Sequence, residues 1–164
     1  MNIWVMRHGE AGFNALTDSE RSLTENGRKM ALEQGIWLAE RLMATERKLD
    51  KVIVSPFIRA KQTFEYLLQG VAKIDVNQEM CIKRHLEIWD GITPEGNLEN
   101  VLNYLDFLRA EGATNILMIS HLPLVYDLVS NLTMHQDSVH FYPAVIAELE
   151  WTTNLGKITL VKKL

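Results

Sequence analysis

The sequence of 164 residues contains a single cysteine, Cys81. One thiol can form neither a disulfide within the chain nor a cysteine-rich zinc cluster, so neither device holds this fold together. The four prolines and nine glycines are scattered and do not gather into a linker or a low-complexity stretch. We therefore expect one domain over residues 1–164, stabilised by its hydrophobic core.

A long apolar run and an excess of positive charge are also missing. No stretch approaches the roughly 18 apolar residues of a membrane-spanning helix, and the N-terminal residues lack the order of a signal peptide. The 17 lysines and arginines are outnumbered by 21 aspartates and glutamates, which gives a formal net charge of −4. These features favour a cytoplasmic protein and argue against nucleic-acid and membrane partners.

What the chain does contain is an alternation of short apolar runs and longer amphipathic patterns. Strands are predicted for the runs at residues 3–6, 51–55 and 115–120, which are too short for helices. Apolar residues at helical spacing predict helices at residues 25–43, 56–67, 98–111 and 123–132. The remaining segments are predicted as a short strand at 71–77, a loop at 78–96, and two closing strands at 144–151 and 157–163 around a turn at Asn154–Gly156.

Strands that alternate with helices are typical of a sheet covered by helices on both faces. The predicted fold is therefore a three-layer α/β/α domain with a mainly parallel sheet and an antiparallel edge.

Polar residues follow each of the three predicted parallel strands. The residues at these strand ends are Arg7-His8-Gly9-Glu10, then Ser55-Pro56 with Arg59, and then Ser120-His121. Ligands of open α/β sheets bind at the carboxyl ends of the strands, so we expect two arginines and two histidines to meet there. Any one of them alone would more often be an ordinary polar residue, as we take His85, His135 and His140 to be.

Two arginines beside two histidines form a set suited to phosphate chemistry. Arginine pairs in bidentate fashion with phosphate oxygens, and a neutral imidazole can act as a nucleophile. Zinc ligation by His8 and His121 is the alternative, but the flanking arginines would repel a cation and no further ligand lies at suitable spacing. We expect no metal and no cofactor.

Three segments resemble the histidine phosphatase superfamily. Arg7-His8-Gly9 resembles its RHG signature, residues 55–63 (S-P-F-I-R-A-K-Q-T) resemble its S-P-x-x-R-A-x-x-T block, and residues 120–123 (S-H-L-P) resemble its later histidine block. Chain length, the segment 21–24 and the string S-H-L-P-L-V at 120–125 make it most similar to the small phosphohistidine phosphatases of that superfamily. The resemblance implies a phosphoglycerate-mutase-like fold without a lid insertion.

The resemblance also implies roles for individual residues. His8 would be the nucleophile and would be transiently phosphorylated. Arg7 and Arg59 would bind the phosphoryl oxygens, and His121 would donate a further hydrogen bond to them. Arg21 and Asn14 are candidates for secondary phosphate contacts.

The general acid is not assigned by the sequence. Asp90 stands one residue away from the position that related chains use, and Glu87 and Glu95 are alternatives. A phosphate ester expels an alkoxide and needs an acid, whereas phosphohistidine expels imidazole, whose pKa of about 6.5 makes protonation easy. A chain without a clear acid therefore fits N–P substrates better than alcohol esters.

The sequence thus predicts a phosphohistidine protein phosphatase. Its substrate would be a phosphorylated histidine on a phosphotransfer protein of a signalling relay, cleaved through a phosphohistidine enzyme intermediate with inorganic phosphate as product. One alternative is a small-molecule phosphomonoesterase or mutase-like enzyme. Another is a phosphoprotein-binding module that holds phosphohistidine without cleaving it.

Overall fold

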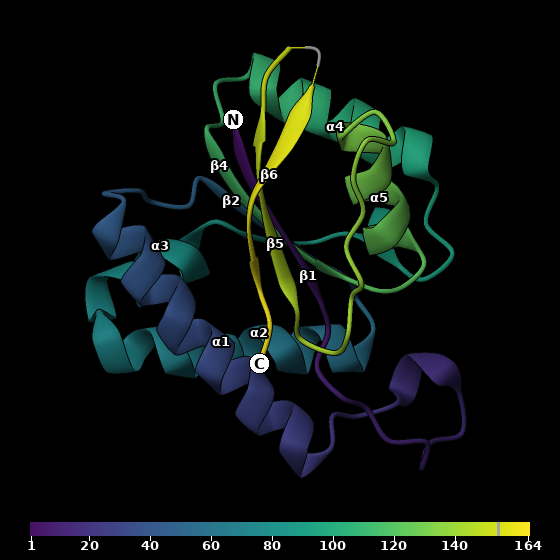
Figure 1. Ribbon diagram of the computed structural model, residues 1–164. Coiled ribbons are helices and arrows are strands. Elements are labelled where there is room, and N and C mark those ends of the chain that lie inside the picture. Colours follow the sequence, from purple (N-terminus) through teal and green to yellow (C-terminus); the bar gives the residue numbers. More distant parts are fainter. Residues whose placement is uncertain (154) are drawn as a thin grey trace.

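The computed structural model describes residues 1–153 and 155–164, and within them a six-stranded sheet lies between two layers of helices (Figure 1). The strands are β1 (Asn2–Arg7), β2 (Lys51–Val54), β3 (Leu86–Ile88), β4 (Asn115–Ser120), β5 (Ile146–Trp151) and β6 (Gly156–Lys162). The helices are α1 (Glu25–Ala44), α2 (Ile58–Ile74), α3 (Val76–Arg84), α4 (Leu98–Ala110) and α5 (Leu124–Leu132), with short 3-10 helices η1 (Asp18–Glu20) and η2 (Asp90–Ile92).

The strand order across the sheet is β3-β2-β4-β1-β5-β6. The first four strands run parallel, while β5 is antiparallel to β1 and β6 is antiparallel to β5. The prediction of a three-layer α/β/α fold with a mainly parallel sheet and an antiparallel edge is therefore confirmed.

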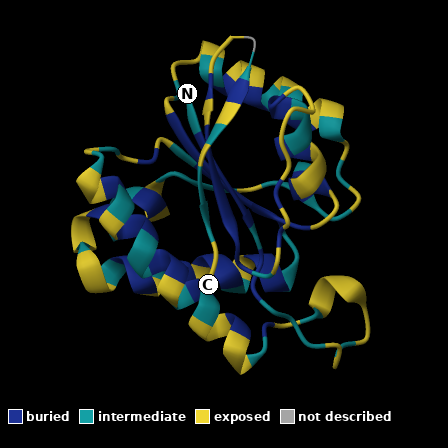
Figure 2. Ribbon diagram, viewed as in Figure 1, coloured by how far each residue is buried: buried dark blue, intermediate teal, exposed yellow. Residues whose placement is uncertain are grey.

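The central strands are buried on both faces, as the continuous apolar runs predict. Alternate residues of β1 enter opposite cores: Ile3 and Val5 pack in the core beneath α4 and α5, and Trp4 and Met6 pack in the core beneath α1 and α2. Figure 2 shows these strands as a buried centre with exposed residues on the outer helical surfaces. Helices on both sides thus hold the parallel strands in fixed positions.

Helices α1 and α2 touch at the level of their backbones. A Cβ atom built on Gly35 of α1 would lie 2.0 Å from the Leu67 carbonyl oxygen, and one on Gly70 of α2 would lie 2.1 Å from the Leu32 carbonyl oxygen. Only glycine allows this approach, so the pair sets the distance between the two helices.

The predictions for residues 71–77 and 78–96 are wrong. Residues 71–74 are the last turn of α2, and the predicted loop contains most of α3, all of β3 and η2. Asp75 starts α3 as its N-cap, with its carboxylate accepting hydrogen bonds from the backbone amides of Asn77 and Gln78. Because α3 buries little besides Gln78 and Ile82, its apolar pattern is too weak to indicate a helix.

The closing pair of strands is present as β5 and β6. The turn predicted between them at Asn154–Gly156 includes Asn154, which lies outside the described residues. Over the described ranges, no helix combines the length and the apolar character needed to cross a membrane.

We predict that Gly70→Ala destabilises the protein by about 1–3 kcal/mol, because the added methyl group must push α1 and α2 apart. Urea unfolding measures this change. Gly12→Ala is the matched control: a Cβ there would meet its nearest atom, in the side chain of Thr24, at 3.9 Å, so the change should stay within about 0.5 kcal/mol. Equal stability of the two variants would contradict the close helix contact.

Candidate active site

The ends of β1, β4 and β2 meet at one edge of the sheet. Arg7 is paired with Ser120 in the parallel ladder, and beyond the strand the His8 amide donates to the Ser120 carbonyl at 3.0 Å. The Ser55 amide likewise donates to the Ile119 carbonyl at 3.1 Å. The imidazoles of His8 and His121 then lie with ring centroids 5.1 Å apart, so the structure brings together the groups expected at the strand ends.

His8 is buried and its ring is held in one orientation. Its Nδ1 lies 2.7 Å from the Gly9 carbonyl oxygen. Because a carbonyl can only accept, Nδ1 carries the hydrogen of the neutral ring and Nε2 presents a lone pair. Burial, mainly, and the positive charges of Arg59 and Arg7 together lower the pKa of His8 to about 4, against the opposing effect of the Gly9 bond. The imidazole is therefore neutral near pH 7, as a nucleophile requires.

His121 is buried beside His8. Its Nε2 lies 2.7 Å from the Ser55 hydroxyl, and its Nδ1 is buried without a hydrogen-bond partner among the described residues. Burial, mainly, together with the charges of His8 and Arg59, lowers its pKa to about 3. His121 thus enters the site as a second neutral imidazole with one ring nitrogen still to be satisfied.

Arg59 and Arg7 bring two positive charges to these rings. Arg59 is buried in the first turn of α2, and its Nε donates to His8 Nε2 at 3.3 Å. Arg7 donates from Nη1 to the Phe141 carbonyl at 2.8 Å, while its Nε is buried without a partner in the described part of the chain. Burial, together with the charges of Arg59 and Arg21, lowers the pKa of Arg7 below its usual value. A buried N–H without a partner is costly, so this arrangement suits an anionic ligand with acceptor oxygens.

The loop that carries His8 packs directly on the start of α1. A Cβ on Gly9 would lie 2.8 Å from the Gly27 carbonyl oxygen, and one on Gly27 would lie 2.1 Å from the Glu10 carbonyl oxygen. The Gly9 amide also donates to the Thr63 hydroxyl of α2 at 2.9 Å. The loop position is therefore set by both α1 and α2.

The two predicted secondary phosphate contacts lie on the segment between β1 and α1. Arg21 donates from Nε to the Gly12 carbonyl at 2.8 Å and from Nη1 to the Asp18 carboxylate at 3.1 Å. Asn14 is exposed and forms no hydrogen bond with His8, Arg59 or His121. The structure thus connects Arg21 to the site through Asp18 and shows no such contact for Asn14.

The three candidate acids lie in different surroundings. Glu87 forms an ion pair with Lys51 at 2.9 Å and accepts a hydrogen bond from Tyr104; Lys51 begins β2, at the end of the strand away from the site. Asp90 is exposed on η2. The Ser120 hydroxyl donates to the Ile92 carbonyl at 2.7 Å, and this bond joins η2 to the end of β4 at the site. Glu95 is exposed beyond η2. In the described residues, none of the three hydrogen-bonds to His8 or His121.

Sequence reasoning missed Asp18, which contacts both Arg21 and Arg59. Its one signal is an opposite charge three residues before Arg21. A contact with Arg59, 41 residues away, depends on how the segment 9–24 folds over α2, and no local pattern indicates that path.

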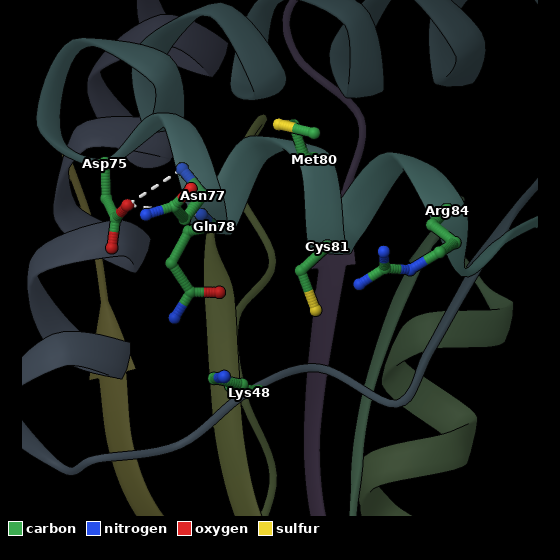
Figure 3. A pocket seen from close by; sticks show the side chains of 7 residues that line it. All are labelled: Lys48, Asp75, Asn77, Gln78, Met80, Cys81 and Arg84. Atoms are coloured by element: carbon green, nitrogen blue, oxygen red, sulfur yellow. Dashed lines mark hydrogen bonds between the residues drawn. The ribbon is translucent and has the colours of Figure 1, made fainter.

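Another hollow, of about 290 Å³, lies at the far edge of the sheet beside α3 (Figure 3). It is lined by Lys48, Asp75, Asn77, Gln78, Met80, Cys81 and Arg84. None of the predicted site residues lies there. Over residues 1–153 and 155–164, no group of three or more His, Cys, Asp or Glu side chains is placed to hold a metal ion.

We predict that the two buried histidines make stability fall in acid. Because the folded pKa of His8, about 4, lies below the unfolded value of about 6.5, the unfolded state binds more protons between these values. The free energy of unfolding therefore rises with pH across this window and levels off above it. His8 alone should contribute roughly 2 kcal/mol between pH 5 and pH 7.

Urea unfolding at pH 5 and pH 7 checks this expectation. His8→Gln should reduce the pH dependence by about that amount, whereas His140→Gln, at an exposed position, should keep the wild-type dependence. The same pH dependence in wild type and His8→Gln would contradict the lowered pKa.

Comparisons with known proteins agree with this geometry. A family model for the histidine phosphatase superfamily (branch 1) matches residues 3–116. A phosphohistidine phosphatase SixA homolog of Haemophilus influenzae is 40% identical over 161 residues, which are 98% of this chain and 94% of the relative.

Solved structures extend the comparison to the fold. The protein histidine phosphatase SixA complexed with tungstate is 32% identical, with a TM-score of 0.81 over 98% of this chain and 96% of that one. A phosphoglycerate mutase of Bacillus anthracis str. Sterne is only 13% identical but has a TM-score of 0.72 over 96% of this chain and 91% of its own, which confirms the phosphoglycerate-mutase-like fold. Motifs, fold and relatives agree, and the chain belongs to the histidine phosphatase superfamily.

Proposed function

We propose that this protein is a phosphohistidine phosphatase that hydrolyses the N–P bond of a phosphorylated histidine on a phosphotransfer protein of a signalling relay. The observation that carries the proposal is the neutral His8 ring, whose Nε2 lies beside the Arg59 guanidinium while Nδ1 donates to Gly9. The named function of the SixA relatives supports the choice of substrate.

The reaction would proceed in two displacements at phosphorus. His8 Nε2 attacks the phosphoryl group, the P–N bond to the partner's histidine breaks, and the departing imidazole takes up a proton. Water then attacks the phosphohistidine on His8, which releases inorganic phosphate and returns the neutral ring. Arg7 and Arg59 neutralise charge on the phosphoryl oxygens, and His121 contributes a further hydrogen bond.

The surroundings of the carboxylates fit a leaving group that needs little acid catalysis. Glu87 is engaged with Lys51 and Tyr104, while Asp90 and Glu95 are exposed. Asp90 is the favoured acid of the three, because η2 is joined to the end of β4. Imidazole can depart after protonation from solvent, whereas an alkoxide cannot.

Exposed apolar side chains near the site support a protein as the substrate. Phe13 and Leu16, on the segment between β1 and α1, are 82% and 96% exposed. On another side, exposed Tyr126 and Tyr142 line a hollow of about 340 Å³ together with Arg7. Such residues at the entrance suit contact with a protein surface that carries the phosphohistidine. We also propose, as the sequence predicts, that residues 1–164 form one domain with an uncovered site that acts in the cytoplasm without a cofactor.

The two alternative functions make different demands. A small-molecule phosphomonoesterase or mutase-like enzyme would turn over sugar phosphates or phosphoglycerate as well as phosphohistidine protein. A non-catalytic binding module would hold phosphohistidine without releasing phosphate. The neutral His8 ring favours catalysis over binding alone.

We predict that wild-type protein mixed with a ³²P-labelled phosphohistidine phosphotransfer domain becomes transiently labelled. His8→Ala should form no labelled intermediate and should lose at least about 10³-fold in turnover, because removal of a catalytic nucleophile lowers kcat by several orders of magnitude. Rapid quenching and acrylamide gels measure the label. His135→Ala, at an exposed position, is the matched control and should behave like wild type.

Steady turnover by His8→Ala would contradict the proposed mechanism. Tight binding of the phosphoprotein by the wild type without phosphate release would favour the binding module. Faster hydrolysis of phosphoglycerate or sugar phosphates than of phosphohistidine protein would favour the small-molecule enzyme.

We also predict that Asp90→Asn changes ester and N–P hydrolysis unequally. Hydrolysis of an alkyl phosphate should fall by about 10²-fold, because the alkoxide loses its proton donor. Turnover of phosphohistidine protein should stay within about threefold, because imidazole leaves readily. Glu95→Gln serves as the control, and an equal loss on both substrates would show that the acid acts on the N–P bond as well.

A further inference from the structure

We propose that Asp18 is a positioning residue that orients the Arg59 guanidinium toward the phosphoryl group at His8. The proposal rests on the proposed function for its substrate, but its geometry involves only residues of this chain. Asp18 begins η1, on the segment that passes over the start of α2 on its way from β1 to α1.

The contacts divide the guanidinium into two edges. Arg59 donates from Nη1 to the Asp18 carbonyl at 2.7 Å and from Nη2 to the Asp18 carboxylate at 3.1 Å. These two acceptors occupy the end of the guanidinium. Its Nε donates to His8 Nε2 at 3.3 Å, so the side edge, formed by Nε and the second hydrogen of Nη2, is directed at the nucleophile.

That side edge is the one a phosphoryl group would meet. Arginine binds phosphate through two parallel N–H groups, and a pair of this kind requires the guanidinium plane to be fixed. Arg59 is the only residue of α2 that donates to His8 in the described structure. With the end edge held by Asp18, the side edge can bind two oxygens on the phosphorus that His8 attacks, once its Nε exchanges the contact with His8 Nε2 for a phosphoryl oxygen.

Asp18 is itself held by a second arginine. One carboxylate oxygen accepts from Arg21 at 3.1 Å while the other accepts from Arg59. Arg21 is in turn bonded to the Gly12 carbonyl and lies over the Phe13 ring with its Cζ 4.1 Å from the ring centroid. The chain Arg21–Asp18–Arg59 therefore connects the segment after β1 to α2 through one carboxylate.

Two other roles for Asp18 fit the contacts less well. As a general acid it would need a proton, but both carboxylate oxygens accept from arginines. Partial desolvation raises the pKa of Asp18, but hydrogen bonds from Arg21 and Arg59 outweigh it and lower the pKa below its usual value. As a competitor for phosphate it would need to cover the side edge of Arg59, and its contacts lie on the end edge.

The exposure of Asp18 allows its role to be tested without disrupting the fold. Its side chain is 57% exposed, whereas that of Arg59 is 5% exposed. Glu20 offers a matched control in the same 3-10 helix. It carries the same charge, but its carboxylate accepts from Thr17 and has no contact with Arg59 among the described residues.

The experiment compares Asp18→Ala, Asp18→Asn and Glu20→Ala with wild type. Calorimetry measures vanadate affinity, phosphate release measures kcat and KM on phosphohistidine protein, and urea midpoints check the fold. Asp18→Ala should lower kcat about 10- to 100-fold, with a smaller change in KM, and weaken vanadate binding about 10-fold. Asp18→Asn should recover part of the loss because its amide oxygen still accepts from Nη2, and Glu20→Ala should match wild type.

Removal of the Asp18 carboxylate should have little effect on kcat when Arg59 has been replaced by lysine, which lacks the planar guanidinium group. In an Arg59→Lys background, Asp18→Ala should change kcat by less than threefold, because lysine has no edge to orient. A full additional loss in that background would overturn the proposal and show that Asp18 acts on its own.

The remaining outcomes also decide the matter. Unchanged kcat and vanadate affinity in Asp18→Ala would overturn the proposal, and tighter vanadate binding would identify Asp18 as a competitor for phosphate instead. If wild type binds vanadate but does not turn over phosphohistidine protein, the proposed function fails, while the vanadate affinities still decide the role of Asp18.

Discussion

The site depends on the parallel hydrogen-bond ladder that joins β2, β4 and β1. The ladder continues one residue past the ends of the strands, where the amides of His8 and Ser55 donate to carbonyls of β4. These bonds fix the positions at which the segments after β1 and β2 leave the sheet. Side chains separated by more than 100 residues therefore face one another with no dedicated loop structure between them. Burial of the strands on both faces holds these positions rigidly, because a shift of one strand would disturb the packing of both hydrophobic cores.

Electrostatics follows from that rigid framework. The same burial that removes His8 and His121 from water also lowers their pKa values, and the nearby arginines add to the effect. Two guanidinium groups and two neutral imidazoles then share a small volume in a chain whose net charge is −4. A local positive field of this kind matches one phosphoryl group and would not favour an extended polyanion. Arg59 has its compensating charge in Asp18, whereas Arg7 keeps a buried Nε–H without a partner in the described residues.

The sequence was sufficient to predict the parts of the molecule that depend on local pattern. Continuous apolar runs indicated the buried strands, and the ends of these strands indicated that His8, Arg59 and His121 lie close together. Helix α3 could not be predicted because it buries so few side chains that its sequence shows no helical spacing of apolar residues. Asp18 could not be predicted for another reason: its contact with Arg59 arises from the path of an irregular segment, which depends on tertiary packing. Glu87 looked equivalent to Asp90 in sequence, and only the pairing of β3 with β2 places it beside Lys51.

The contact between the loop of His8 and the first turn of α1 has a consequence for how this protein can vary. Two backbones touch at Gly9 and Gly27, with no side chain between them that could yield. The contact therefore restricts movement of the loop relative to the first turn of α1. For the same reason neither position can accept even a methyl group unless the other segment shifts. Single substitutions can alter the exposed residues around the entrance, and with them the choice of partner. The position of His8 relative to the sheet cannot be altered by single substitutions at Gly9 or Gly27 without a shift of the backbone.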